Sequence, residues 1–297
     1  MSISKGMKVL SLAAMATLTM ACGAEGPGDG DGMTGGDTGG SCNAQGQGVA
    51  ADQIVATVSW PDTIGVVGGS GQLVIWTRAD LDFDGMNVSG SVSPCGSTLP
   101  VIQTKAIVGG HKIQPIIPDE IWDLSGMPQT TASGTVSGFD PGSTILMQPA
   151  TALLGLEMAD VEAAWPDKWT DIQAVDHDGD GALGITSVPN TNDGFSAPPT
   201  GIFPDSPKAS ALYLVSRSVV ELQGTRDSCT TASGTAIVHK FDNHIIGCAL
   251  EGGGECDDAQ TSFIDSNRTV YKVESATYDM KQLPEGVSCA DVRAAFQ

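Results

Sequence analysis

A stretch near the middle of the chain, VDHDGDGALGIT, carries three aspartates at alternate positions followed by glycine. Asp176, Asp178 and Asp180 occupy the first, third and fifth positions of an EF-hand-type calcium loop. Gly181 can adopt the positive φ that bends such a loop back on itself, and the Ala182 carbonyl falls at the seventh position. Hard oxygen donors at this spacing converge on one point. The sequence therefore predicts bound Ca²⁺ with Asp176, Asp178, Asp180 and Ala182 as ligands.

The second half of the loop departs from the EF-hand pattern. Ser187 stands at the twelfth position, where a bidentate glutamate normally closes the coordination sphere. Pro166 before the loop and Pro189 after it argue against the flanking helices of an EF-hand. We expect a calcium loop without those helices, a structural role for the ion, and a weak dissociation constant of about 10⁻⁴ to 10⁻³ M.

Two alternatives bear on this interpretation. Aspartate and glycine also suit tight turns without an ion, but three like charges so close together repel one another, and a divalent cation relieves that repulsion. Asp80, Asp82 and Asp84 form a second Asp-x-Asp-x-Asp pattern. There the intervening Leu81 and Phe83 require burial, so we predict a strand whose wet face carries the acids.

No stretch of the sequence carries a recognisable catalytic or cofactor-binding motif. Nucleophile elbows, phosphate-binding loops, dinucleotide fingerprints and zinc-protease helices are all absent from the sequence, so no catalytic residue and no cofactor-binding residue is assigned. The chain has four histidines. His177 lies in the aspartate loop at a position expected to point outward. His239 and His244 flank 241–243, which resembles a hairpin tip, so exposed turn positions are expected for both.

The charge balance limits the partners. The formal net charge is −21, from 35 acidic and 14 basic residues. A surface of this sign repels nucleic acid and anionic lipid head groups, and it attracts cations. We therefore expect no nucleic-acid partner.

The N-terminus predicts export. Residues 1–21 have two lysines, a short apolar run and a small residue before Cys22, as in a removable signal peptide too short to span a bilayer. The end of this segment, LTMAC, resembles the lipobox of bacterial lipoproteins, with Thr19 where an aliphatic residue is usual. The resemblance implies lipidation of Cys22. Gly23 in place of the aspartate that retains many lipoproteins at the inner membrane implies the outer membrane, on its periplasmic or surface face.

Composition then divides the mature chain into two parts. Residues 22–41 form a linker rich in glycine and acids that has too little apolar surface to fold, and 42–297 form a single β-rich domain. Six cysteines remain besides Cys22, an even number behind an export signal, which predicts three disulfides. A zinc site is less consistent with their spacing. Six cysteines allow about fifteen pairings, so connectivity stays open.

The fold class follows from short apolar runs that alternate with polar residues and end in Gly, Pro and Ser clusters. This spacing predicts a mainly β fold, an antiparallel sandwich or barrel, with two similar β-halves as a further option. Loose echoes such as QLVIWTRADLDF and ALYLVSRSVVEL suggest the two halves. One or two short helices are expected, over Met158–Trp165 and Ala290–Phe296.

Several stretches together carry a wider resemblance: SWPDTIGVVGGSGQLVIWT, SGSVSPCGSTLP, SGTVSGFDPGSTI and the aspartate loop. They resemble a family of secreted lipoproteins from soil bacteria related to the gliding myxobacteria, from residue Ile54 onward. The resemblance implies an envelope lipoprotein and transfers no catalytic residue.

Two functions are consistent with these features. The first is a non-enzymatic binding or surface-structural β module, anchored in a membrane by its lipid, that holds a small apolar ligand or a surface protein. The second is a secreted, calcium-stabilised hydrolase that uses an Asp/Glu pair as acid and base. The first is favoured because no sequence motif identifies a nucleophile or a general base.

Overall fold

The computed structural model describes residues 42, 46–190, 194–196 and 207–297, and from Cys42 onward these form one compact unit. The predicted signal peptide 1–21, Cys22 and the linker 22–41 lie outside the described residues. None of the helices in this described part has the length and hydrophobicity needed to span a bilayer.

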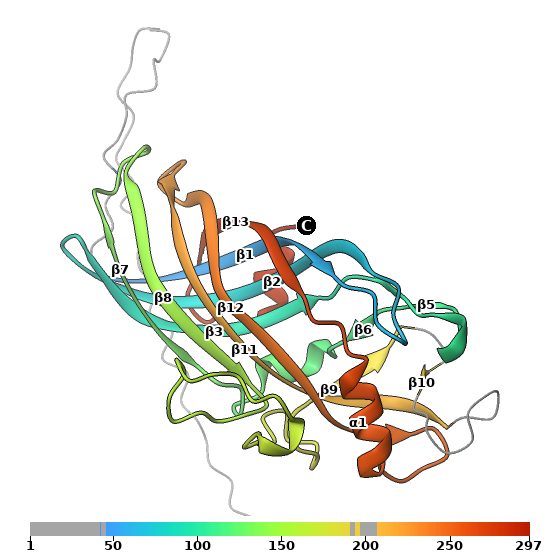
Figure 1. Cartoon of the computed structure of the whole chain (residues 1–297). Coiled ribbons are helices and arrows are strands. Elements are labelled where there is room, and N and C mark those ends of the chain that lie inside the picture. Colours follow the sequence, from blue (N-terminus) through green and yellow to red (C-terminus); the bar gives the residue numbers. More distant parts are fainter. Residues whose placement is uncertain (1–41, 43–45, 191–193, 197–206) are drawn as a thin grey trace, which may run out of the picture. The chain divides into compact units, whose positions relative to one another are not determined.

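Eight long strands follow one another around a single antiparallel ring (Figure 1). Each pairs with the next of these strands in chain order, and the last pairs with the first. The mainly β, antiparallel prediction is therefore confirmed as a closed barrel, and the pairing does not divide it into two halves. The strands are β1 (Gly46–Trp60), β2 (Gly69–Asp84), β3 (Asn87–Thr98), β7 (Thr130–Val136), β8 (Thr144–Leu154), β11 (Lys208–Arg226), β12 (Thr231–Leu250) and β13 (Lys272–Leu283).

Strand β2 illustrates why these segments form a barrel wall. Leu81 and Phe83 pack into a core cluster, whereas Asp82 and Asp84 are exposed on the opposite face. Successive side chains of a strand point to opposite faces, so one face meets the core and the other meets water. The prediction of a strand over Asp80, Asp82 and Asp84 is confirmed, and Gly85 turns the chain into β3 with a φ of 59°.

Shorter elements lie between the long strands. β4 (Ile102–Gln103) pairs with β5 (Lys112–Ile113), and β6 (Pro115–Ile116) pairs with β9 (Ile185–Pro189). β9 and β10 (Phe195–Ser196) both pair with β11. Three single-turn 3-10 helices complete these connections: η1 (Ala106–Val108), η2 (Asp119–Asp123) and η3 (Trp169–Asp171).

Strands β12 and β13 pair over only part of their length. Their register covers Thr231–Thr235 against 281–277, and beyond it the two strands separate. Helix α1 (Asp258–Ser266) packs on β12 there, and its Phe263 and Ile264 line the barrel interior. The helix therefore closes the part of the wall where the ladder ends.

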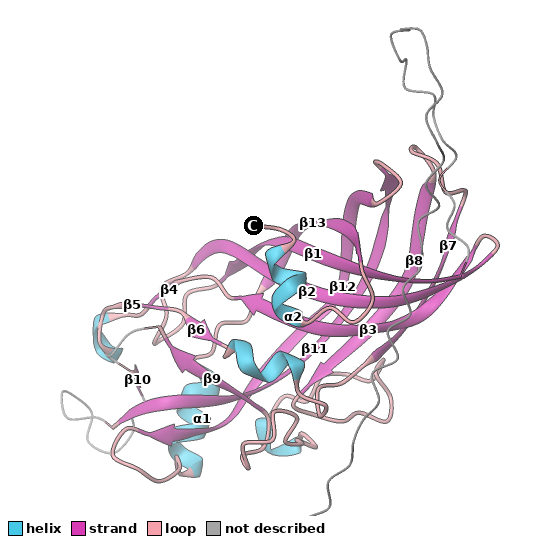
Figure 2. Cartoon of the chain, turned by 180° about the vertical axis from the view of Figure 1, so that it is seen from behind, coloured by secondary structure: helices cyan, strands magenta, loops and turns pink. Residues whose placement is uncertain are grey.

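The helices differ from the sequence expectations. Met158–Trp165 is irregular, not helical, because the Val161 and Ala163 carbonyls accept hydrogen bonds from the Arg217 guanidinium and not from helical amides. Helix α2 (Cys289–Ala294) matches the other prediction closely, begins at a Ser288 capping box, and lies against β2 and β3 (Figure 2).

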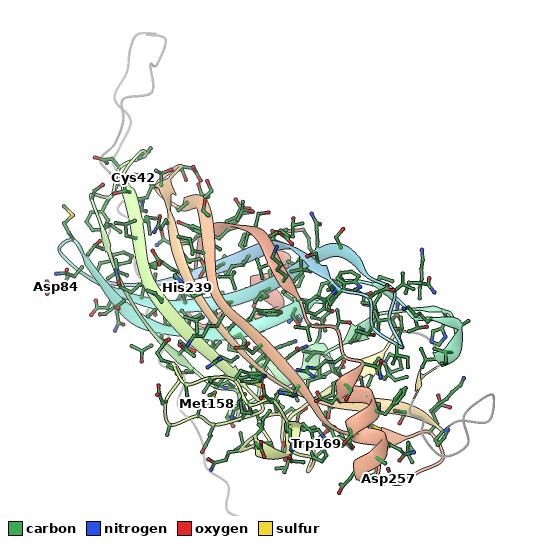
Figure 3. All side chains as sticks on the ribbon, in the orientation of Figure 1. Cys42, Asp84, Met158, Trp169, His239 and Asp257 are labelled. Atoms are coloured by element: carbon green, nitrogen blue, oxygen red, sulfur yellow. A yellow bond between two sulfur atoms is a disulfide. The ribbon has the colours of Figure 1, made fainter. Side chains whose placement is uncertain are left out.

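Three disulfides join the six cysteines other than Cys22, as expected. Cys42 pairs with Cys229, Cys95 with Cys289 and Cys248 with Cys256. The first two close loops of 187 and 194 residues, and the third closes a loop of 8. Cys42 and Asp84 lie towards one end of the barrel, and Trp169 and Asp257 lie towards the other (Figure 3). The long-range pair Cys95–Cys289 holds α2 on β3.

Candidate ligand cavity and aspartate loop

The barrel interior contains a partly open cavity of about 310 Å³. Eight strands make an interior just wide enough to be filled by side chains or to hold one small ligand. Many inward residues here are small or medium in size, so they leave part of the interior open. The volume falls at the lower end of the range for small-molecule pockets. Apolar side chains from most of the barrel strands form much of the lining, among them Ile54, Ile75, Leu214, Val220 and Phe241.

One carboxyl group lies in this lining. Asp52, on β1 opposite Thr77 of β2 and Met280 of β13, is 3 % exposed. Thr77 Oγ1 donates to Asp52 Oδ2 over 3.3 Å, and Asp52 Oδ1 has no hydrogen-bond partner among the described residues. Burial raises the pKa of Asp52 to about 7, against the smaller opposing effect of the Thr77 bond. No basic side chain of the described residues forms an ion pair with it.

Asp52 was not among the residues predicted from the sequence, although a signal was present. In AADQIVATVSW the inward phase of the strand runs through Ala50, Asp52, Ile54, Ala56 and Val58. An acidic residue among side chains that are otherwise apolar and face inward indicates a buried carboxyl group. Such a group requires a partner or has a function.

The aspartate loop brings its three carboxylates together, as the spacing predicted. Oxygens of Asp176, Asp178 and Asp180 lie within 4.8 Å of one another. The amides of Gly179 and Gly181 donate to Asp176 over 2.6 and 3.0 Å. Although burial opposes ionisation of Asp176, these amide donors lower its pKa overall. The loop backbone is therefore organised around the carboxylates.

Asp178 is the buried member of the three, at 7 % exposed. Its Oδ2 accepts a 2.7 Å bond from the Thr186 amide, and its Oδ1 is buried without a partner. Burial raises the pKa of Asp178, and the charges of Asp180 and Asp176 raise it further. An orphaned buried oxygen beside two more carboxylates fits a hard divalent cation, and these residues could hold Ca²⁺. Ala182 stays a predicted ligand.

Strand β9 links the loop to the cavity. The Thr186 hydroxyl donates to Asp180, and the neighbouring Ile185 is 1 % exposed and lines the cavity. β9 then pairs with Leu212–Leu214 of β11. His177, predicted to point outward, is half-buried instead, because its Nδ1 accepts a 3.0 Å bond from the Gly155 amide.

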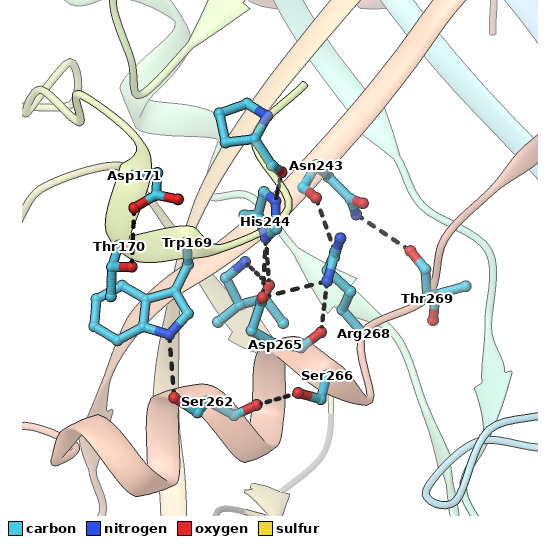
Figure 4. A network of polar contacts seen from close by, with 12 residues as sticks. Trp169, Thr170, Asp171, Asn243, His244, Ser262, Asp265, Ser266, Arg268 and Thr269 are labelled. Carbon is cyan, nitrogen blue, oxygen red and sulfur yellow. Dashed lines mark hydrogen bonds and ion pairs between the residues drawn. The ribbon is translucent and has the colours of Figure 1, made fainter. Parts of the chain in front are cut away.

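A second buried carboxyl, Asp265 of α1, lies in a complete polar network (Figure 4). His244 Nδ1 lies 2.9 Å from both Asp265 oxygens, and His244 Nε2 lies 2.8 Å from the Pro166 carbonyl. The Ile245 amide also donates to Asp265, and Arg268 lies 3.3 Å from it. The Pro166 carbonyl can only accept a hydrogen bond, so His244 Nε2 donates to it. His244 Nδ1 faces the Asp265 oxygens, so both ring nitrogens lie next to acceptor atoms.

The expectation that His244 is exposed at a hairpin tip is wrong. β12 continues through 241–243, and His244 is 0 % exposed. Asp242 is held by Arg217 over 2.6 Å, and the Asn243 amide donates to the Thr269 carbonyl. These partners keep Asp-Asn in a strand. His239 is exposed as expected, although in β12 rather than a turn, and lies 2.9 Å from Glu221.

The His244 network is structural. Trp165 stacks on the His244 ring at 5.7 Å between centroids. The Arg217 guanidinium lies 5.2 Å from the centroid of the Trp165 ring and donates to the Val161 carbonyl of the same loop. Both ring nitrogens of His244 and both oxygens of Asp265 already have partners. The His244 ring and the Asp265 carboxylate are therefore fully occupied by partners within the chain, and their contacts fix α1 and the 161–166 segment on the barrel.

Comparison with known proteins does not assign a family. No protein-family model, curated protein or solved structure gives a significant match to the chain. The site geometry therefore carries the functional argument alone.

Proposed function

We propose that this protein is a non-enzymatic binding protein that holds one small apolar molecule inside its barrel. The observation that carries the proposal is the 310 Å³ cavity with its largely apolar lining. Burying the apolar surface of a ligand in such a space contributes roughly 25 cal/mol per Å² before the cost of immobilisation is subtracted.

The hydrolase alternative is less well supported by this interior. A glycosidase-type mechanism needs two carboxyl groups about 5 to 10 Å apart across the scissile bond. Asp52 is the only carboxylate in the cavity lining among the described residues. The aspartate loop holds three carboxylates, but its own backbone amides occupy several of their oxygens.

Calcium is proposed as structural support for the binding domain. Asp176, Asp178 and Asp180 would hold the ion, with the Ala182 carbonyl as a further ligand. The positive charge of the ion would neutralise the negative charge of the three carboxylates. The loop leads directly into β9, which forms part of the cavity wall through Ile185. Ion binding would therefore rigidify the wall rather than act on a substrate.

An envelope location is part of the proposal. Three disulfides are typical of oxidising compartments and support export. Lipidation of Cys22, attachment to the outer membrane, and the resemblance to myxobacterial-type lipoproteins rest on the sequence alone. With its domain tethered by the linker 22–41, the protein would present the cavity next to the membrane.

The test is binding of the neutral, apolar fluorophore N-phenylnaphthylamine to the folded domain. Ala152 lines the cavity, and the adjacent Thr151 of β8 points to the opposite face. Ala152→Phe fills the cavity and should weaken binding about tenfold or more. Thr151→Phe adds a phenyl ring on the other face and should leave the affinity unchanged. No binding to the wild type, or equal weakening by both variants, would refute an interior site.

A further inference from the structure

We propose that the ligand is an apolar molecule with a single cationic amine, and that this amine pairs with Asp52 inside the barrel. The inference rests on the proposed ligand-binding function and specifies the chemistry of the ligand for the same cavity.

The contacts of Asp52 leave one oxygen of its carboxyl group without a hydrogen-bond partner. Thr77 Oγ1 bonds to Oδ2, whereas Oδ1 is buried without a partner. Met280 lies opposite Asp52 on the adjoining strand and contributes only apolar surface. The cavity lining also holds the basic side chains of His111 and Arg268, and neither forms an ion pair with Asp52. Tyr278 of β13, 1 % exposed, has a pKa raised to about 12 by burial and by the charge of Asp52. Tyr278 therefore stays neutral and supplies no positive charge.

Charge then selects among polar head groups. A buried carboxylate is costly unless a cation lies beside it and bonds to it. A ligand amine supplies both the positive charge and the donor for Oδ1. A ligand alcohol supplies only a donor, and a ligand carboxylate would be repelled by the same charge. The chain as a whole, with a net charge of −21, also attracts cations from solution.

The apolar side chains that line the rest of the cavity indicate that the ligand also has a hydrocarbon part. Ala50, before it on β1, belongs to one apolar cluster, and Ile54, after it, belongs to another. Ile54, Ile75 and Leu73 line the same cavity further along β1 and β2. A hydrocarbon tail attached to the amine would cover these side chains. A small inorganic cation would leave them bare, so an amphiphilic amine fits the interior better than a metal ion.

The test compares three ligands with the same tail: decylamine, decanol and decanoate, each displacing N-phenylnaphthylamine at about pH 8. Wild type should bind decylamine about tenfold or more tightly than decanol, and decanoate least. Asp52→Asn should remove the difference between amine and alcohol. The matched control Asp82→Asn removes an exposed carboxylate from β2 and should preserve it.

The possible results distinguish failure of the amine inference from failure of the proposed ligand-binding function. If none of the three ligands displaces the fluorophore, or the fluorophore does not bind, the cavity function fails. If decanol binds as tightly as decylamine in wild type, the cavity function stands and the amine inference is overturned.

A measurement on wild type alone covers the case in which Asp52→Asn does not fold. Decylamine stays charged between about pH 8 and pH 5, while Asp52 gains a proton across its pKa of about 7. The preference for amine over alcohol should therefore shrink about tenfold or more over that range. An unchanged preference would show that Asp52 does not hold the amine.

Discussion

Asp52 and Asp265 are buried to nearly the same degree, 3 % and 5 % exposed, but their surroundings are opposite. Asp265 has an imidazole, a backbone amide and a guanidinium around it. Asp52 accepts a hydrogen bond from one threonine hydroxyl, and no basic side chain of the described residues forms an ion pair with it. Burial alone therefore does not identify a site. A buried charge whose partners are all supplied by the chain stabilises the fold, and one left without partners is available to a ligand.

The aspartate loop lies between these two cases. The chain supplies amide donors to its carboxylates, but Asp178 Oδ1 is left without a partner, and no basic side chain in the described part of the chain forms an ion pair with the cluster. Three carboxylates in a polar, partly exposed loop suit a metal ion. One carboxylate in an apolar interior suits an organic cation. The number of carboxylates and the polarity of their surroundings therefore decide whether a metal ion or an organic cation is the better ligand.

The largest expected effect is on the Asp265 network. Asp265→Asn replaces by a neutral amide the carboxylate that contacts the buried His244 ring, the Ile245 amide and Arg268. We expect the free energy of unfolding to fall by about 3 kcal/mol or more, measured by urea denaturation near neutral pH. The control Asp258→Asn alters an exposed acid on the same helix and should change it by less than about 1 kcal/mol. A small loss for Asp265→Asn would mean that the network is dispensable.

The same substitution at Asp52 should act in the opposite direction. The pKa of Asp52 is about 7 in the folded protein, against its ordinary value of 3.8. Between these values the folded protein binds more protons than the unfolded chain, so Asp52 lowers the stability as pH rises. Asp52→Asn should therefore raise the free energy of unfolding above pH 7 by roughly 2 to 4 kcal/mol.

The pH dependence sharpens this second prediction. The gain from Asp52→Asn should be small near pH 4, grow up to about pH 7 and stay level above it. Urea denaturation of wild type and variant across that range measures it. Asp82→Asn, on the exposed face of β2, serves as the reference. A variant less stable than wild type at pH 8 would place Asp52 in the same class as Asp265.

The smallest effect is expected at the aspartate loop. With a dissociation constant of about 10⁻⁴ to 10⁻³ M, calcium at about 10 mM should stabilise wild type by about 1.4 to 2.7 kcal/mol. Thermal denaturation in calcium and in a chelator measures this difference. Asp178→Ala should abolish it, whereas Asp167→Ala, an exposed acid before the loop, should retain it. Equal melting of wild type in calcium and chelator would rule out the ion.

Much of the fold could be predicted from local patterns. Leu81 and Phe83 alternate with acids and indicated a strand, and an even set of cysteines indicated three disulfides. The spacing of Asp176, Asp178 and Asp180 indicated convergence, since it depends on a tight local turn. Features of this kind are encoded within a few residues.

The candidate binding site could not be predicted in this way. Asp52 becomes an interior residue only when β1 pairs with β13, more than two hundred residues later, and closes the ring. His244 was misassigned because Asp242 and Asn243 resemble a turn in isolation. Their partners Arg217 and Thr269, which hold them in a strand, lie outside any local window. Tertiary partners, not propensity, decide such positions.

The most direct test of the account is a crystal structure of the protein with an alkylamine that carries bromine at the end of its tail. We predict bromine density inside the barrel among the apolar side chains, and the ligand nitrogen about 2.7 to 2.9 Å from Asp52 Oδ1. Density only on the outer surface, or inside with the nitrogen directed away from Asp52, would contradict it.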